Sequence, residues 1–116
     1  MSPYKKAALL AALSLAGCGS HPRVSANDCG LHGDVLSTRI TNSADKPVMR
    51  AQIVADFYQN YRFTRAHGEA SFAPVLDPGT SRVVDIHVNV PDQHGAQPMK
   101  CSVSRAFYGD NTLEDF

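Results

Sequence analysis

Residues 82–90 read Arg-Val-Val-Asp-Ile-His-Val-Asn-Val, and this stretch decides the fold class. Every second residue from Val84 to Val90 is apolar, and the residues between them are Asp85, His87 and Asn89. Successive side chains of a β-strand point to opposite faces, so strict alternation indicates a strand that is buried on one face only. The sequence therefore predicts a half-buried strand over 82–90.

The same period of two residues recurs along the chain. It predicts strands at 34–41, 48–58 and 99–107, with shorter strands at 61–66 and 69–75. Turn chemistry separates these segments at 42–47, at the hairpin tip 58–61, at Asp77-Pro78-Gly79 and in the polar loop 91–98. About six or seven short strands with such turns predict an all-β fold, a single antiparallel β-sandwich over residues 29–109. The acidic tail, 110–116, is expected either to fray or to dock as a strand.

The alternation also predicts which side chains form the core. In 34–41 the inward side chains are Leu36, Thr38 and Ile40. In 48–58 they are Met49, Ala51, Ile53, Ala55 and Phe57, and Val54 breaks the pattern. In 99–107 they are Met99, Cys101, Val103 and Phe107.

The first 17 residues have the pattern of an export signal. Lys5 and Lys6 precede an apolar run from Ala7 to Ala16, which is too short for a membrane-spanning helix and typical of a signal-peptide helix. Leu15-Ala16-Gly17-Cys18 resembles a bacterial lipobox. This resemblance implies cleavage between Gly17 and Cys18, acyl chains on Cys18 and a lipidated tether over 18–28. It also implies an anchor in the cell envelope, with the outer membrane facing the periplasm favoured because Gly19, not Asp, follows the lipidated cysteine.

The two remaining cysteines are expected to pair. With Cys18 acylated, Cys29 and Cys101 are left, and an exported protein enters an oxidising compartment. A disulfide would join the first segment of the domain to its last predicted strand. The alternative is a redox or metal site, but the chain contains no Cys-x-x-Cys motif.

Several turn motifs resemble a known group of domains. They are Thr41-Asn42 before Pro47-Val48, then Phe57-Tyr58, and then Leu76-Asp77-Pro78-Gly79-Thr80-Ser81. Their order is similar to that of small immunoglobulin-like or transthyretin-like sandwiches of bacterial envelope proteins, including the FxLYD-type domains. The chain departs from that pattern at Gln59, where an acidic residue is usual, and no Gly follows at the hairpin tip. The resemblance implies an immunoglobulin-like sandwich and brings no catalytic residues.

The sequence predicts no enzyme, cofactor, metal site or nucleic-acid partner. The 116 residues carry 11 basic and 11 acidic side chains, and this balance lacks the basic excess of nucleic-acid binders. No Gly-x-Ser-x-Gly motif is present, and no cysteine is left over as a nucleophile. The five histidines are spread along the chain, at His21, His32, His67, His87 and His94.

One segment has the composition of a binding surface. Tyr and Arg are enriched in binding hot spots, and the candidate residues are Tyr58, Tyr61, Arg62, Phe63 and Arg65. The alternative is an edge hairpin whose aromatic residues close the sandwich. The sequence therefore favours a lipid-anchored, non-enzymatic interaction or structural module with a protein partner in the envelope. Other hypotheses are an accessory subunit of an envelope machine, such as a secretion system, and an inhibitor of a periplasmic or host hydrolase that presents 58–67 or 91–98.

Overall fold

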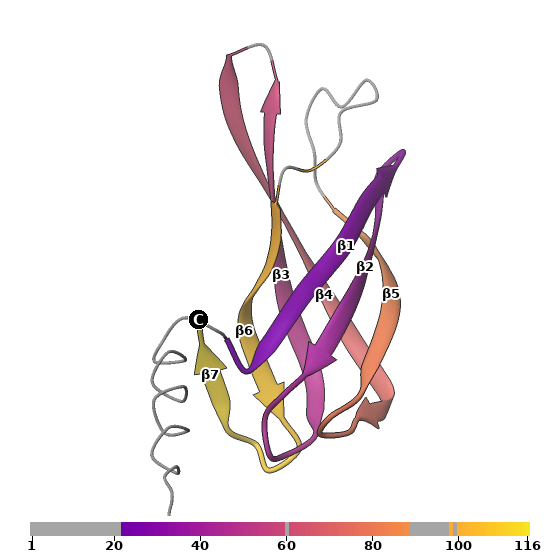
Figure 1. Ribbon diagram of the computed structural model, residues 1–116, viewed down its shortest axis with the longest axis vertical. Coiled ribbons are helices and arrows are strands. Elements are labelled where there is room, and N and C mark those ends of the chain that lie inside the picture. Colours follow the sequence, from indigo (N-terminus) through magenta and orange to yellow (C-terminus); the bar gives the residue numbers. More distant parts are fainter. Residues whose placement is uncertain (1–21, 60, 89–97, 99) are drawn as a thin grey trace, which may run out of the picture.

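Two antiparallel β-sheets make up the fold. The computed structural model describes residues 22–59, 61–88, 98 and 100–116 (Figure 1). The strands are β1 (Val24–His32), β2 (Val35–Asn42), β3 (Val48–Gln59), β4 (Arg62–Leu76), β5 (Ser81–His87), β6 (Lys100–Tyr108) and β7 (Leu113–Asp115). One sheet has the order β1-β2-β5 and the other β4-β3-β6-β7. The predicted signal segment 1–17, Cys18, Met99, Val90 and most of the loop 91–98 lie outside the described residues.

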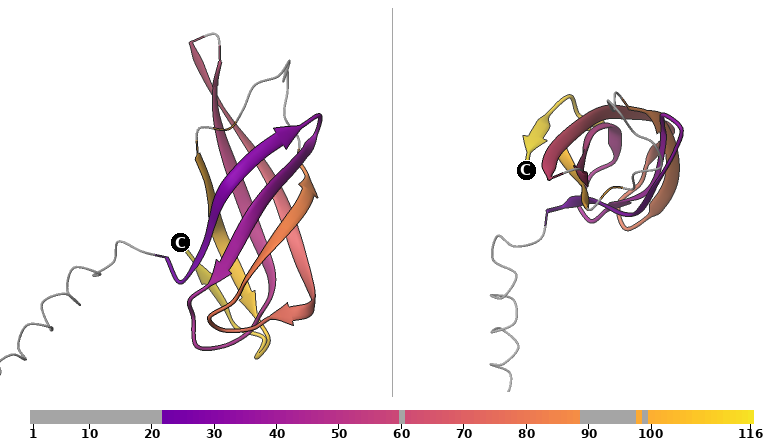
Figure 2. Two further views of the ribbon diagram at one scale, coloured as in Figure 1. Left: turned by 45° about the vertical axis from the view of Figure 1, so that its right-hand side comes forward. Right: turned by 90° about the horizontal axis from the view of Figure 1, so that it is seen from above.

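The two sheets enclose a common apolar core. Figure 2 shows the strands of both sheets arranged around the interior of the domain. Both sheets contribute fully buried side chains, such as Leu36 and Ile40 from β2 and Ile53 and Phe57 from β3. Within the described residues the chain has no helix. The prediction of an all-β, two-sheet fold with antiparallel strands is confirmed.

The predicted burial pattern holds where the strands pair regularly. In β2, Leu36, Thr38 and Ile40 are all buried, and in β5 Ile86 is buried while His87 is exposed. The predicted strands 61–66 and 69–75 form one strand, β4, because the residues between them, including Gly68, stay paired with β3. The turns at 42–47 and 77–79 are present, and Gly79 has a φ of 77°, a conformation that favours glycine.

Two β-bulges make parts of the predicted core wrong. Val48 rather than Met49 is fully buried, because the pairing of β3 with β6 shifts between Val48 and Arg50 and leaves Met49 as an extra residue opposite β6. In β6, Ala106 and Tyr108 face the core and Phe107 does not. An extra residue in β6, opposite the register shift at Gln52 and Ile53, changes the face of every side chain that follows.

The ends of the domain also differ from the predicted boundaries. β1 begins at Val24, inside the predicted tether 18–28, because Val24 is fully buried and pairs with Asn42 at the end of β2. β1 is an edge strand, and its sequence is mostly polar. It therefore lacks the apolar alternation from which the other strands were predicted. At the other end, β7 pairs with β6, so part of the tail 110–116 docks as a strand.

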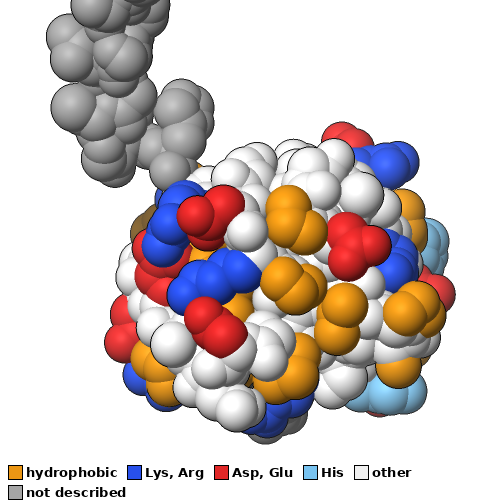
Figure 3. Space-filling view, turned by 90° about the horizontal axis from the view of Figure 1, so that it is seen from below, with side chains coloured by type: hydrophobic (Ala, Val, Ile, Leu, Met, Phe, Trp, Pro, Cys, Tyr) orange, Lys and Arg blue, Asp and Glu red, His pale blue; other side chains and the backbone are white. Residues whose placement is uncertain are grey.

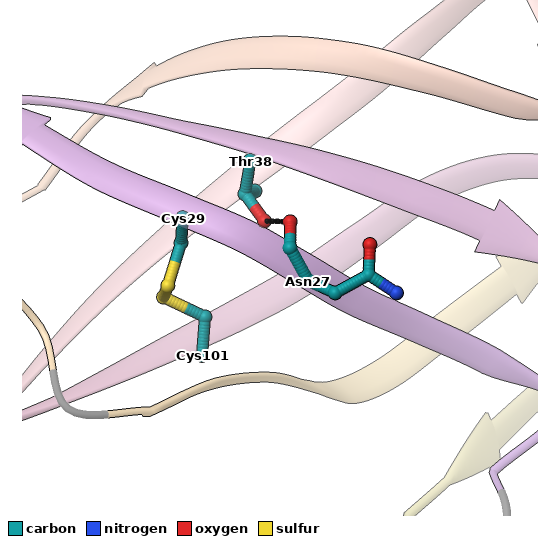
Figure 4. Close-up of a disulfide and its surroundings, with 4 residues drawn as sticks. All are labelled: Asn27, Cys29, Thr38 and Cys101. Carbon is teal, nitrogen blue, oxygen red and sulfur yellow. Dashed lines mark hydrogen bonds between the residues drawn. A yellow bond between two sulfur atoms is a disulfide. The ribbon is translucent and has the colours of Figure 1, made fainter.

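The disulfide between Cys29 and Cys101 is present and confirms the predicted pairing. Cys29 lies on β1 and Cys101 on β6, so the bond joins the two sheets (Figure 4). Next to Cys29 the register of β1 shifts between Asn27 and Gly30, and the buried Thr38 hydroxyl donates a 2.9 Å hydrogen bond to the Asn27 carbonyl. This bond satisfies a backbone acceptor where the strand ladder is irregular.

Asn42 organises the end of the sandwich where β2 meets the following turn. Its side chain is fully buried, and its amide donates to the carbonyls of Lys46 at 3.0 Å and Leu76 at 2.9 Å. Its side-chain oxygen accepts from the Ala44 N–H at 2.9 Å. One polar side chain thus fixes the 42–47 turn against the end of β4.

Candidate functional site

The predicted binding surface lies on a hairpin that projects beyond the rest of the sandwich (Figures 1 and 2). β3 and β4 stay paired up to Gln59 and Arg62, whereas β6 pairs with β3 only as far as Asp56. The last residues of the hairpin therefore have no third strand beside them within the described residues. We call residues 57–59 and 61–65 the projecting hairpin.

Three aromatic side chains on the projecting hairpin face solvent. Tyr61 is 92% exposed, Phe63 is 72% exposed and Tyr58 is 49% exposed. Tyr58 and Phe63 are cross-strand neighbours, and their ring centroids lie 5.0 Å apart at an interplanar angle of 59°. Their contact holds the two strands together where the third strand is missing, and it leaves much of both rings accessible.

The core at this end of the domain is closed by another aromatic side chain, Phe57, and not by the three exposed ones. Phe57 is only 2% exposed and belongs to the core cluster. It lies on the opposite face of β3 from Tyr58 and Asp56, since neighbouring side chains alternate. Phe57 therefore closes this end of the core, and Tyr58, Tyr61 and Phe63 are not needed for that purpose.

The two predicted arginines differ in their electrostatic surroundings. Arg65 donates two hydrogen bonds to the Asp56 carboxylate, from Nε at 2.7 Å and from Nη2 at 3.2 Å. This hydrogen bond is the main reason that the pKa of Asp56 lies below its usual value. Within the described residues Arg62 is exposed and has no ion-pair partner. Arg62, at the end of the hairpin, thus carries the uncompensated positive charge.

A hollow at the base of the hairpin was not predicted from the sequence. Its volume is about 450 Å³, and Val54, Arg65, Lys100 and Phe116 are among the residues that line it. Val54 is on the outer face of the sheet and is only 8% exposed. The break that Val54 makes in the alternation of 48–58 was the available signal.

A cluster of ionic side chains ties the beginning of the described chain to β7. Arg23 donates three hydrogen bonds to Glu114, the shortest of 2.7 Å, and the Tyr108 hydroxyl donates a bond of 2.6 Å to the same carboxylate. The bond from Arg23 is the largest cause of the lowered pKa of Glu114. Burial, followed by the bond to Glu114, raises the pKa of Tyr108 to about 12.

This cluster lies toward the end of the molecule that is remote from the projecting hairpin (Figure 1). Nearby, Lys46 binds Asp110 at 3.1 Å and lies 4.7 Å from the centre of the Tyr108 ring. Figure 3 shows this end from below, with basic and acidic side chains side by side. Positive charge is therefore matched by negative charge at this end, in contrast to Arg62 on the hairpin.

Gly17 and Cys18, the predicted cleavage and lipidation residues, lie outside the described residues. Within the described ranges, no group of three His, Cys, Asp or Glu side chains could hold a metal ion. In the same part of the chain, no helix has the length and apolar character needed to cross a membrane.

Comparison of the chain with protein-family models, with curated proteins and with solved structures finds no match.

Proposed function

We propose that the protein is a lipid-anchored, non-enzymatic interaction module of the bacterial cell envelope. In this proposal Cys18 carries the acyl chains, the two-sheet domain holds the projecting hairpin away from the membrane, and the hairpin binds a protein partner. The outer membrane, facing the periplasm, is the favoured location, since Gly19 follows the lipidated cysteine. The fold proposed for the domain is immunoglobulin-like, a proposal supported by the order β1-β2-β5 in one sheet and β4-β3-β6-β7 in the other.

The observation that carries the proposal is the exposure of the hairpin aromatics. Tyr61 and Phe63 are 92% and 72% exposed, although burying such a side chain is worth about 1.5–3 kcal/mol. Tyr, with its rigid ring and polar tip, is a frequent contact residue in protein interfaces. Three exposed rings on one projection are explained by a partner that covers them better than by the stability of the isolated domain.

The position of the hairpin supports an outward-facing role. Arg23 is the fifth residue after Cys18, so the chain between them can span at most about 18 Å. Because Arg23 is bound to Glu114 on β7, the anchor would hold the β7 end of the domain close to the membrane. The projecting hairpin lies toward the other end and would face the envelope interior.

A second candidate function is inhibition of a periplasmic or host hydrolase. The specific observation that favours it is the shape of the site, since a two-stranded projection fits a concave cleft. An accessory subunit of an envelope machine would use the same surface against a different partner. The two classes differ in outcome, because an inhibitor lowers the rate of a purified hydrolase and a subunit co-purifies with a membrane assembly.

The test uses the full chain produced in bacteria, with chemical cross-linking of intact envelopes. We expect the mature protein to carry acyl chains on Cys18 by mass spectrometry and to form a cross-linked complex. The double variant Tyr61→Ala, Phe63→Ala should lose that complex. Val83→Ala is the matched control, because Val83 is a 53% exposed apolar residue on β5. Loss of the complex in the control, or no loss in the double variant, would contradict the proposal.

A further inference from the structure

Tyr61 occupies a backbone conformation that is unusual for an aromatic residue. Its φ is 61°, in the left-handed region, and it belongs to a two-residue loop between the paired residues Gln59 and Arg62. Such loops favour glycine at their second position, because glycine has no Cβ to clash with the backbone. A bulky residue with positive φ is an outlier. Glycine would adopt the backbone conformation of position 61 at lower cost than Tyr61 does.

The side chain of Tyr61 makes no packing contacts with the described residues that would offset the cost of its backbone conformation. At 92% exposure the Tyr61 side chain packs against almost nothing in the domain. Outliers of this kind persist where the surroundings or a function require them. Tyr61 therefore costs stability locally and contributes little packing in return.

The charge beside Tyr61 is also uncompensated. Arg62 follows it directly, and within the described residues it has no carboxylate partner, since Asp56 is occupied by Arg65. The end of the hairpin thus combines an exposed aromatic ring with a free guanidinium. Both groups are on a convex projection, so a complementary surface must be concave, apolar in its centre and acidic at its edge.

We infer that Tyr61 and Arg62 insert into a concave apolar pocket, rimmed by carboxylates, on a protein of the envelope. This inference rests on the proposed function, because it specifies the partner of the same hairpin. Tyr61 fills the pocket and Arg62 binds its acidic rim, while Tyr58 and Phe63 cover the surrounding surface. Aromatic and Arg side chains also suit a lipid headgroup layer. A protein is favoured here because Arg23, the fifth residue after the predicted anchor, is bound to β7, toward the opposite end of the domain.

The experiment places p-benzoylphenylalanine, a photo-crosslinking amino acid, in place of Phe63 in the full lipidated chain. Irradiation of intact cells should give one protein adduct. In this background Tyr61→Gly and Arg62→Glu should each lower the adduct yield by about tenfold or more, as for residues of a binding hot spot. Tyr61→Phe and Val83→Ser are the matched controls and should keep most of the yield. Mass spectrometry should locate the adduct in a pocket with Asp or Glu at its edge.

Tyr61→Gly has a second readout that separates binding from folding. In urea denaturation its folding equilibrium constant should stay the same or rise, by up to about fivefold, because glycine relieves the left-handed strain. A rise in stability together with a loss of the adduct supports the inference. A fall in stability of more than about threefold would show that Tyr61 serves the fold, and would overturn it.

Other outcomes also overturn the inference. An adduct that persists in Tyr61→Gly or Arg62→Glu shows that the hairpin end does not make the contact. An adduct to phospholipid identifies a membrane instead of a protein pocket. The same cross-linking amino acid at Val83 distinguishes failure of this inference from failure of the proposed function. Protein adducts from Val83 but not from Phe63 would leave an interaction module with a different surface, whereas no protein adduct from either position would contradict the proposed function as well.

Discussion

Reduction of the disulfide should remove a large part of the stability of the domain. Cys29 and Cys101 are 72 residues apart in sequence, and the bond closes a loop that includes most of both sheets. The entropy of closing a loop of this length corresponds to about 4 kcal/mol of stabilisation. A domain of this size is stable by about 5–10 kcal/mol in total, so the reduced protein should be marginal.

Urea denaturation measures this loss directly. With a slope of about 1.5 kcal/mol/M, a loss of about 4 kcal/mol lowers the midpoint by about 3 M. The oxidised protein should be compared with the protein in reductant, which keeps both sulfur atoms and loses only the bond. The double variant Cys29→Ala, Cys101→Ala should be less stable than the reduced protein, because Cys101 is only 9% exposed and its sulfur also packs in the core.

The reasoning would be refuted by a loss below about 1 kcal/mol in the reduced protein. That result would mean that the hydrogen-bonded sheets and the core already hold β1 against β6, or that the unfolded chain is compact without the bond. Equal stability of the reduced protein and the double alanine variant would refute the packing part alone.

Three further predictions concern single residues. Asn42→Ala should lower the free energy of unfolding, measured in urea, by about 3 kcal/mol, because it leaves buried backbone groups without hydrogen-bond partners. A loss below about 1 kcal/mol would contradict this prediction. Gly68→Ala should cost about 1–3 kcal/mol in the same assay, since a Cβ there would lie 3.1 Å from the backbone oxygen of His87 as well as 2.8 Å from Cδ1 of Ile86. An unchanged midpoint would show that β5 moves away from β4 at little cost. The third prediction concerns the ion pair of Arg23 and Glu114. The folded pKa of Glu114 is lowered, so this pair stabilises the fold above the usual pKa of 4.5 and is lost as the pH falls through the folded value. The urea midpoint of the wild type should therefore fall more on acidification below pH 4.5 than that of Glu114→Gln, and parallel pH profiles would exclude the pair.

The sequence predicts this fold well wherever alternation and pairing stay in phase. β2 and β5 have regular partners, and their buried residues follow from the pattern alone. The bulges at Met49 and Ser104 insert one residue without leaving a signal in the sequence, and each changes which side chains face the core. β1 was not predicted for another reason: this edge strand has only two fully apolar buried side chains, Val24 and Leu31, and the residues between them show no alternation.

The composition of the sequence was enough to locate the candidate surface, but not to predict which of its arginines forms an ion pair. The excess of Tyr and Arg in 58–67 correctly located exposed side chains. That Arg65 is compensated and Arg62 is not depends on the register that places Asp56 opposite Arg65. A register is set by the turn and by the partner strand together, so the difference between these two arginines emerges only in the folded chain.

The domain divides its ionic interactions unequally between its two ends. Bound pairs hold β7, the 42–47 turn and the start of the described chain together at one end, through Arg23–Glu114, Lys46–Asp110 and Arg105–Asp115. On the projecting hairpin the only ion pair among the described residues, Arg65–Asp56, lies at the base, and beyond it the two strands are joined by their backbone pairing and by a pair of tilted rings. Because the core is closed by Phe57 below those rings, the outer hairpin contributes little to the fold. A segment with so small a part in stability tolerates a strained residue such as Tyr61, which is consistent with the contact surface that we propose at the end of the hairpin.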